Sequence, residues 1–372
     1  GNGARASQPG FYDWYETVKI NYGVRPDGTR DFDSLPEGFD TKDIKAHNEF
    51  WKDKTVPDSW VKFRDIAMYW LDLGVDGFRF DMAEMVPVEF WSFMNSSIKT
   101  KNPDAYLVAE VYQPHLYRDY IKKGKMDYLY DKVQLYDTIK HVMQGHGSTD
   151  NIPPIQDDLK DIEHHMLHFL ENHDEQRIAS PDFAGSAEKG KPAMVVSATI
   201  SSSPTLIYFA QEFGEPGAED LGFGDPTRTS IFDYGSVPSL VRWNNNQNFD
   251  GGQSTEQEKA LRDFYKRLLN FTINSSALAE NYQDIHLFNR EYTEWYNDKV
   301  LSFVRWSDDE KLIVVSNFNA ENTYGFELGL PQDIIEKWNL KDGEYQVVDQ
   351  LYNSFTSTLN VVNNQARVRV DI

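Results

Sequence analysis

The sequence predicts an α/β protein with a parallel sheet, followed by a small antiparallel β domain. Between Val75 and residue 211, strand-like runs begin 21 to 40 residues apart with helical stretches between them, which is the rhythm of βα units. From residue 300 onward, apolar and polar residues alternate as they do in half-buried strands. A barrel and an open doubly wound sheet both fit the first pattern, but no glycine-rich phosphate loop follows any strand, which weakens the dinucleotide-binding version.

The elements follow one another in a regular order. Residues 1–58 are rich in Gly, Asp, Pro and aromatics without a sustained period, and we interpret them as an irregular subdomain. A helix is expected from Trp60 onward, because residues 61–71 have apolar side chains at helical spacing, and Gly74 follows where the helix would stop. The strands expected next are 75–81, 105–111, 126–130, 165–171 and 205–211. Helices are expected between these strands at 87–98, 116–123 and 192–201, and after them at 256–269. The later strands are expected at 300–306, 311–317, 324–330, 344–350 and 366–372.

Composition excludes several classes of function. Lys and Arg number 37 against 59 Asp and Glu in 372 residues, and the resulting charge of −22 would repel nucleic acid. The chain has no cysteine, which rules out disulfides, thiolate catalysis and cysteine-ligated zinc. No apolar run approaches the ~18 residues of a membrane helix. We therefore expect neither a nucleic-acid partner nor a membrane span.

The strand at 75–81 carries the first candidate site residues. Side chains alternate between faces, so Arg79 and Asp81 share one face while Phe78 and Phe80 occupy the other, beneath covering helices. An Arg beside an Asp favours the ionised carboxylate that a nucleophile requires. A structural ion pair explains the same two residues equally well.

Two further strands end in polar side chains. Glu110 closes the strand at 105–111, where a solvated strand end is the ordinary explanation. His173 and Asp174 follow the strand at 165–171, and a bend is needed there to aim both side chains the same way, because neighbours on a regular strand face apart. The carboxyl ends of parallel barrel strands converge on one rim, which would bring the three carboxylates together.

Three carboxylates with an Arg indicate glycosidic chemistry. One carboxylate attacks, a second protonates the leaving oxygen and then activates water, and further negative charge stabilises an oxocarbenium-like state. A metal site is not predicted, because His164, His165 and His168 do not follow a fixed ligand spacing.

These residues resemble the α-amylase family of glycoside hydrolases. The matching segments are 74–81 (GVDGFRFD), 109–111 (AEV), 169–174 (FLENHD) and 205–212 (TLIYFAQE), in the order of that family's nucleophile strand, acid/base strand, third signature and last barrel strand. The resemblance implies that Asp81 is the nucleophile, Glu110 the general acid/base and Asp174 the transition-state stabiliser. It further implies that Arg79 orients Asp81 and that His173 holds sugar hydroxyls.

The resemblance implies a fold and a domain division. The fold is a (β/α)8 TIM-type barrel, of which strands 4 to 8 lie in this chain, with an irregular inserted subdomain (1–58), a catalytic barrel portion (59–284) and a C-terminal antiparallel β-sandwich (285–372). Five strands cannot close a barrel. We therefore expect a missing N-terminal segment of the same enzyme as a partner, either cut from this chain or present as a separate fragment.

The expected function is that of a retaining α-glucan hydrolase, cleaving α-1,4-glucosidic bonds in starch or maltooligosaccharides by double displacement. Retention implies carboxyl groups of Asp81 and Glu110 about 5 to 5.5 Å apart. Tyr112 is close enough to Glu110 in sequence to line the same cleft. The alternatives are a transglycosylase or oligo-α-glucosidase of the family, or a non-catalytic glycan-binding barrel.

Some features depart from the family pattern or are less specific. Starch-cleaving members often carry Lys and His where this chain has Glu84 and Met85, which leaves bond and chain-length specificity open. No cofactor is required for the chemistry. A structural calcium ion is compatible with the resemblance, and Asp31 and Asp33 are as well explained as solvated loop charges as by calcium binding. We expect an extracytoplasmic location, in the periplasm, at the cell surface or in the medium.

Overall fold

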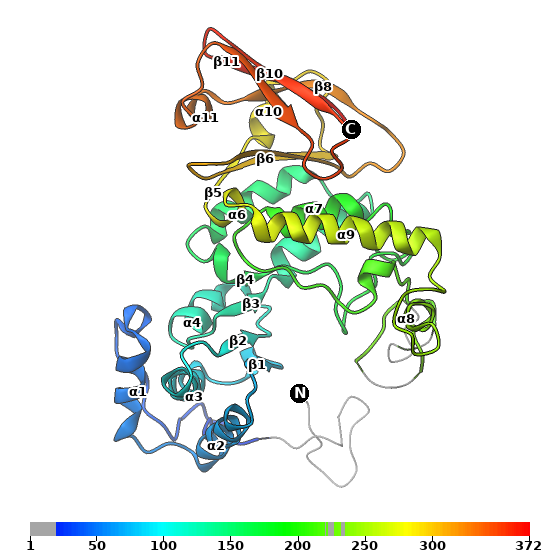
Figure 1. Cartoon of the computed structure of the whole chain (residues 1–372). Helices are drawn as coiled ribbons and strands as arrows, with labels where there is room; N and C mark the ends of the chain where they lie inside the picture. The colour runs from blue at the N-terminus through cyan, green and yellow to red at the C-terminus, as the bar shows by residue number, and fades with distance from the viewer. Residues whose placement is uncertain (1–19, 220, 222–226, 232–234) are drawn as a thin grey trace. The chain divides into compact units, whose positions relative to one another are not determined.

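The computed structural model describes residues 20–219, 221, 227–231 and 235–372 (Figure 1). The chain forms two compact units, Gly1–Tyr130 and Asp131–Ile372.

The first unit combines helices with a short parallel sheet. The strands are β1 (Gly77–Phe80), β2 (Tyr106–Ala109) and β3 (Tyr128–Tyr130). The helices are α1 (Ile44–Lys52), α2 (Asp58–Asp72), α3 (Val88–Lys101) and α4 (Tyr117–Lys122), and short 3₁₀ turns lie at Phe39–Thr41, Ala83–Met85 and Pro114–Leu116. Strand β2 pairs in parallel with β1 and with β3, so Arg79 lies opposite Val108.

Alternation along β1 explains how this unit packs. The ring of Phe80 lies 4.6 Å from that of Trp91 on α3, so the aromatic face of β1 is covered by a helix, as predicted. Gly77 is required for the approach of the two strands, because a Cβ at this position would lie 2.0 Å from the carbonyl oxygen of Tyr106. Trp60 on α2 is fully buried among the aromatic side chains of α1 and α3.

The second unit begins with a helical region. Its helices are α5 (Asp137–Met143), α6 (Ile152–Leu159), α7 (Lys191–Thr199), α8 (Pro238–Asn244) and α9 (Glu256–Asn274), with a π-helical turn at Lys132–Tyr136 and the short strand β4 (Met166–Leu167). Helix α9 starts at a capping box, in which the side chains of Thr255 and Glu258 accept each other's backbone N–H.

Two antiparallel sheets complete the second unit (Figure 1). One has the order β5 (Asn281–Asp284), β6 (Val300–Trp306), β7 (Lys311–Asn317). The other has the order β8 (Gly325–Leu330), β11 (Gln365–Asp371), β10 (Thr356–Val362), β9 (Gly343–Val348), with α10 (His286–Tyr292) and α11 (Gln332–Lys337) between strands of the domain in sequence. Val304 of β6 shares one buried core with Leu328 of β8 and Val368 of β11, which makes the domain a sandwich.

The strand expected at 205–211 is the main difference from the prediction. Only Thr205 forms a β-bridge, a parallel one to His168, and the chain then leaves the extended conformation. The N–H of Tyr208 donates to the side chain of Gln211 instead of to a neighbouring strand, and Ala210 has a left-handed φ of 67°. The strand pattern in the sequence therefore overstated how far regular pairing extends.

The proposed division at 58/59 and 284/285 stays a prediction. Strand β5, which pairs with β6 of the C-terminal sheets, ends at Asp284. Residues 1–19 of the predicted subdomain lie outside the described residues.

Candidate active site

The ends of β1 and β2 bring Arg79, Asp81 and Glu110 together. Nη1 of Arg79 donates to Oδ1 of Asp81, and Nη2 lies 3.5 Å from Oε2 of Glu110. The Asp81 side chain is 66% exposed and that of Glu110 only 8%. One guanidinium therefore joins an open carboxylate, which a ligand can reach, to a nearly buried one.

The Arg79 side chain is held in the charged form. Its guanidinium lies over the Tyr130 ring at 5.5 Å from the ring centre. Burial opposes the charge, but the interactions with Tyr130, Asp81 and Glu110 outweigh it and raise the pKa of Arg79 above its usual value. The cation is a permanent feature of the site.

A strained residue links the two strand ends. Met82, directly after Asp81, has a left-handed φ of 49°, which is uncommon for any residue except glycine. In this conformation its N–H donates to Oε2 of Glu110 at 2.8 Å. Backbone strain of this kind clusters at functional sites, where surrounding contacts enforce it.

Glu84 holds the loop that follows Glu110. One of its carboxylate oxygens, Oε2, accepts the N–H of Tyr112 at 2.8 Å and that of Gln113 at 3.0 Å. From the sequence, Glu84 was recognised only as a departure from a family pattern, and this contact was not predicted. No sequence signal pairs positions 84 and 112, because the contact depends on the β1–β2 register.

His173 and Asp174 meet in the second unit. Nε2 of His173 lies 3.1 Å from Oδ2 of Asp174. Oδ1 of Asn172 accepts the N–H groups of Asp174 at 2.8 Å and Glu175 at 3.0 Å, an Asx turn that supplies the bend the sequence analysis required. The convergence of Asp174 with Asp81 and Glu110 stays a prediction, because Asp174 belongs to the other unit.

A buried ion pair that was not predicted from the sequence joins the two sides of this turn. Nη1 of Arg177 donates to Oε1 of Glu171 at 2.8 Å, and the N–H of Ile178 donates to Oε2 at 2.6 Å. Burial raises the pKa of Glu171, while the Arg177 charge and the Ile178 N–H act against the rise. The Arg177 guanidinium also donates to the carbonyl of Phe209 at 2.7 Å and stacks on the Tyr208 ring at 4.6 Å. The pair thereby ties the base of the His173–Asp174 turn to residues 208–209.

Comparison with known proteins identifies the family. Residues 43–317 match the family model of the α-amylase catalytic domain, and residues 295–368 match that of the α-amylase C-terminal all-β domain. The chain belongs to the α-amylase family. The fold is therefore that of the family, a TIM-barrel catalytic domain followed by a β domain, and the predicted fold class is confirmed.

Two curated α-amylase family relatives and one solved structure are distant in sequence from this chain. The chain is 25% identical over 317 residues to Alpha-amylase 3 of Dictyoglomus thermophilum, covering 77% of this chain and 58% of the relative. It is 24% identical over 270 residues to Neopullulanase 2 of Thermoactinomyces vulgaris, covering 69% and 39%. Among solved structures, the γ-CGTase of alkalophilic Bacillus clarkii superposes with a TM-score of 0.61 at 17% identity, covering 96% of this chain and 47% of that one. The chain thus spans about half the length of the curated relatives it matches.

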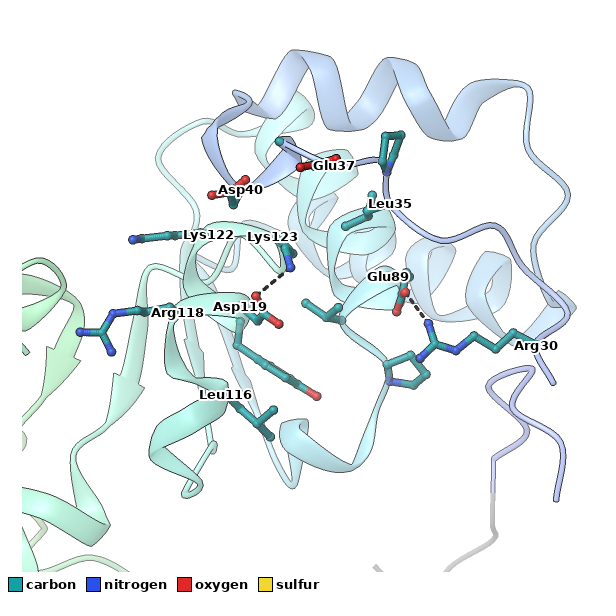
Figure 2. Close-up of a pocket in the computed structure, with 15 residues that line it drawn as sticks. Arg30, Leu35, Glu37, Asp40, Glu89, Leu116, Arg118, Asp119, Lys122 and Lys123 are labelled. Atoms are coloured by element: carbon teal, nitrogen blue, oxygen red, sulfur yellow. Dashed lines mark hydrogen bonds and ion pairs between the residues drawn. The ribbon is translucent and has the colours of Figure 1, made fainter. Parts of the chain in front are cut away.

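A separate cavity of 730 Å³ lies in the first unit of this α-amylase family chain (Figure 2). Its walls come from Arg30, residues 35–38, Asp40, the start of α3 and the segment from Leu116 to the end of α4. Figure 2 shows Arg30 paired with Glu89 and Lys123 paired with Asp119 at its sides. None of the predicted site residues lines it.

Metal ligands and membrane helices are the remaining features of the described residues. They contain no group of three or more His, Asp or Glu side chains arranged to hold a metal ion. Asp31 is paired with Arg25 at 2.6 Å and Asp33 with Lys54 at 2.9 Å. No described helix is long and apolar enough to cross a bilayer.

Proposed function

We propose that the chain carries the catalytic residues of a retaining α-glucan hydrolase that cleaves α-1,4-glucosidic bonds in starch or maltooligosaccharides. The observation that carries this proposal is the single Arg79 guanidinium that joins Asp81 and Glu110 at the ends of two neighbouring strands. Membership of the α-amylase family and relatives named α-amylase and neopullulanase support it.

In the first step, Asp81 is the nucleophile, because its side chain accepts a hydrogen bond from Arg79 and is 66% exposed, so that a substrate can reach it. Its carboxylate attacks the anomeric carbon and forms a covalent glycosyl ester, while Glu110 gives its proton to the departing glycosidic oxygen. Oε2 of Glu110 is engaged by the N–H of Met82, which leaves Oε1 for that proton transfer. Glu110 has become a carboxylate when the leaving sugar departs.

In the second step, Glu110 acts as a base. It takes a proton from water, the resulting hydroxide attacks the anomeric carbon, and Asp81 leaves as a carboxylate. Two inversions give net retention. Asp174 stabilises the positive charge that develops on the sugar ring, His173 binds a sugar hydroxyl, and Tyr112 lines the cleft beside Glu110.

The test is product analysis with maltoheptaose and starch, using the protein and its Glu110→Gln variant. Loss of the general acid/base should reduce kcat by about 10² to 10⁴-fold, while glucan affinity is retained. The exposed Asp104→Asn serves as a matched control that should leave activity unchanged. NMR of the first products should show the α-anomer.

Three results would contradict the proposal. Unchanged turnover in Glu110→Gln would reject the acid/base assignment, and release of the β-anomer would reject retention. Products longer than maltoheptaose would replace hydrolysis by transglycosylation within the same chemistry.

A further inference from the structure

Glu84 connects the segment after the nucleophile to the loop after the acid/base residue. Its Oε2 atom accepts two consecutive backbone N–H groups, those of Tyr112 and Gln113. A carboxylate oxygen that accepts two N–H donors makes charge-assisted hydrogen bonds, which are stronger than bonds between neutral groups. Without Glu84, both donors would lose this acceptor.

The segment that carries Glu84 is itself fixed at several points. Its N–H lies 3.4 Å from the carbonyl oxygen of Glu110, a long contact, while the Tyr120 hydroxyl lies 3.0 Å from the Glu84 carbonyl and 2.7 Å from that of Val86. The single hydroxyl proton of Tyr120 can be donated to only one of the two carbonyls at a time. The Val86 carbonyl is the better acceptor, because it is the closer one. Tyr120 also lines the cavity of Figure 2, so its hydroxyl joins the Glu84 segment to the wall of that cavity.

The result is a clamp formed by Met82 and Glu84 on residues 110–113. The N–H of Met82 donates to the Glu110 side chain, and the Glu84 side chain accepts the N–H groups of Tyr112 and Gln113. The side chain of Glu84 points its charge at backbone amides and so acts through the loop.

We propose that Glu84 is a positioning residue, which fixes the loop that carries Tyr112 and thereby the placement of Glu110 relative to Asp81. This inference rests on the proposed hydrolase function and deepens it. The contact between Glu84 and the Tyr112 N–H should therefore affect the rate of the chemical step, because a small displacement of a catalytic group lowers that rate strongly.

Two variants separate reach from charge. Glu84→Gln keeps an oxygen at the same distance from the backbone and can still accept both N–H groups, whereas Glu84→Asp keeps the charge but is one methylene too short. Glu49→Gln, an exposed carboxylate on α1 paired with Lys52, is the matched control. If Glu84→Gln behaves more like the unmodified protein than Glu84→Asp does, the hydrogen bonds matter; the opposite result means that the charge matters.

Hydrogen exchange at the Tyr112 and Gln113 amides measures the clamp without any substrate. We expect exchange to be about tenfold faster in Glu84→Asp, a change of about 1.4 kcal/mol in the opening equilibrium. We expect less than about threefold in Glu84→Gln, because a neutral acceptor remains. Equal exchange rates in the unmodified protein, Glu84→Asp and Glu84→Gln would overturn the clamp.

Glucan kinetics then test the consequence for catalysis. Glu84→Asp should lower kcat by about tenfold or more with KM within about twofold, and Glu84→Gln should recover most of kcat. A rise in KM with unchanged kcat in both variants would mean that Glu84 binds sugar directly, and would overturn the positioning role. If the unmodified protein cleaves no glucan, the proposed function fails, while the exchange data still decide whether the clamp exists.

Discussion

Replacing Arg177 by Met should destabilise the second unit strongly. The substitution keeps most of the side-chain volume but removes the hydrogen bonds to Glu171 at 2.8 Å and to the Phe209 carbonyl at 2.7 Å. Arg177 is fully buried and Glu171 is 1% exposed, so the Glu171 charge would remain in the interior without its partner. Removal of one member of a buried pair costs about 3 to 5 kcal/mol, and we expect a loss in that range at pH 8.

The loss should shrink at lower pH. Burial already raises the pKa of Glu171, and without the Arg177 charge it rises further. A carboxyl group whose pKa is raised by folding favours the folded state when protonated, so Arg177→Met should be less destabilised at pH 5 than at pH 8. Adding Glu171→Gln removes the buried charge and should recover part of the stability at pH 8.

Urea unfolding at the two pH values provides the measurement. Arg369→Met, at an exposed pair with Asp371, is the control and should change the unfolding free energy by less than about 1 kcal/mol. The reasoning is refuted if Arg177→Met resembles Arg369→Met, or if Glu171→Gln gives no recovery in the Arg177→Met background.

Three further predictions concern other parts of the chain. Gly77→Ala should cost about 3 kcal/mol or more in urea unfolding, because the added Cβ would lie 2.0 Å from backbone oxygen of Tyr106, which cannot move aside as a side chain could; a loss below about 1 kcal/mol would contradict this. Met82→Gly should raise the thermal midpoint of unfolding slightly, since glycine adopts a φ of 49° without strain and keeps the N–H that donates to Glu110. Met82→Pro removes this N–H and should abolish glucan cleavage. Equal activity in the two variants would show that the N–H is not needed. Burial lowers the pKa of His286, whose Nε2 lies 2.7 Å from Asp150, so the stability that neutral His286 contributes is present above the unfolded pKa of about 6.5 and is lost as the pH falls below it. The urea midpoint of unfolding should therefore be lower at pH 5 than at pH 7, and this difference should be smaller in His286→Gln. Equal pH dependence in the two proteins would count against the assignment.

Local pattern predicted the strand faces well. Alternation placed Arg79 and Asp81 opposite to Phe80, and the structure has Phe80 against α3 and Arg79 between two carboxylates. Period two likewise predicted most of the C-terminal strands. Strand β10 (Thr356–Val362) was missed because its first three residues, at 356–358, are all polar, so that its start reads as a loop.

Contacts between distant positions were beyond the reach of pattern. The Glu84 contact with the 112–113 amides depends on the register of two strands, and the Glu171–Arg177 pair depends on a turn that buries both side chains. The strand expected at 205–211 failed for a related reason, since Ala210 adopts a left-handed conformation that its sequence context does not signal.

The shared guanidinium of Arg79 has a consequence for the whole reaction cycle. In the proposed reaction, Asp81 is the anion and Glu110 carries the proton before the first step, whereas after it Asp81 is a neutral ester and Glu110 is the anion. Because Nη1 faces Asp81 and Nη2 faces Glu110, one negative charge borders the cation in both states, and only its position changes. The net charge of the group formed by Arg79, Asp81 and Glu110 is therefore the same before and after the first step. No other charged group has to move to compensate in either half of the cycle.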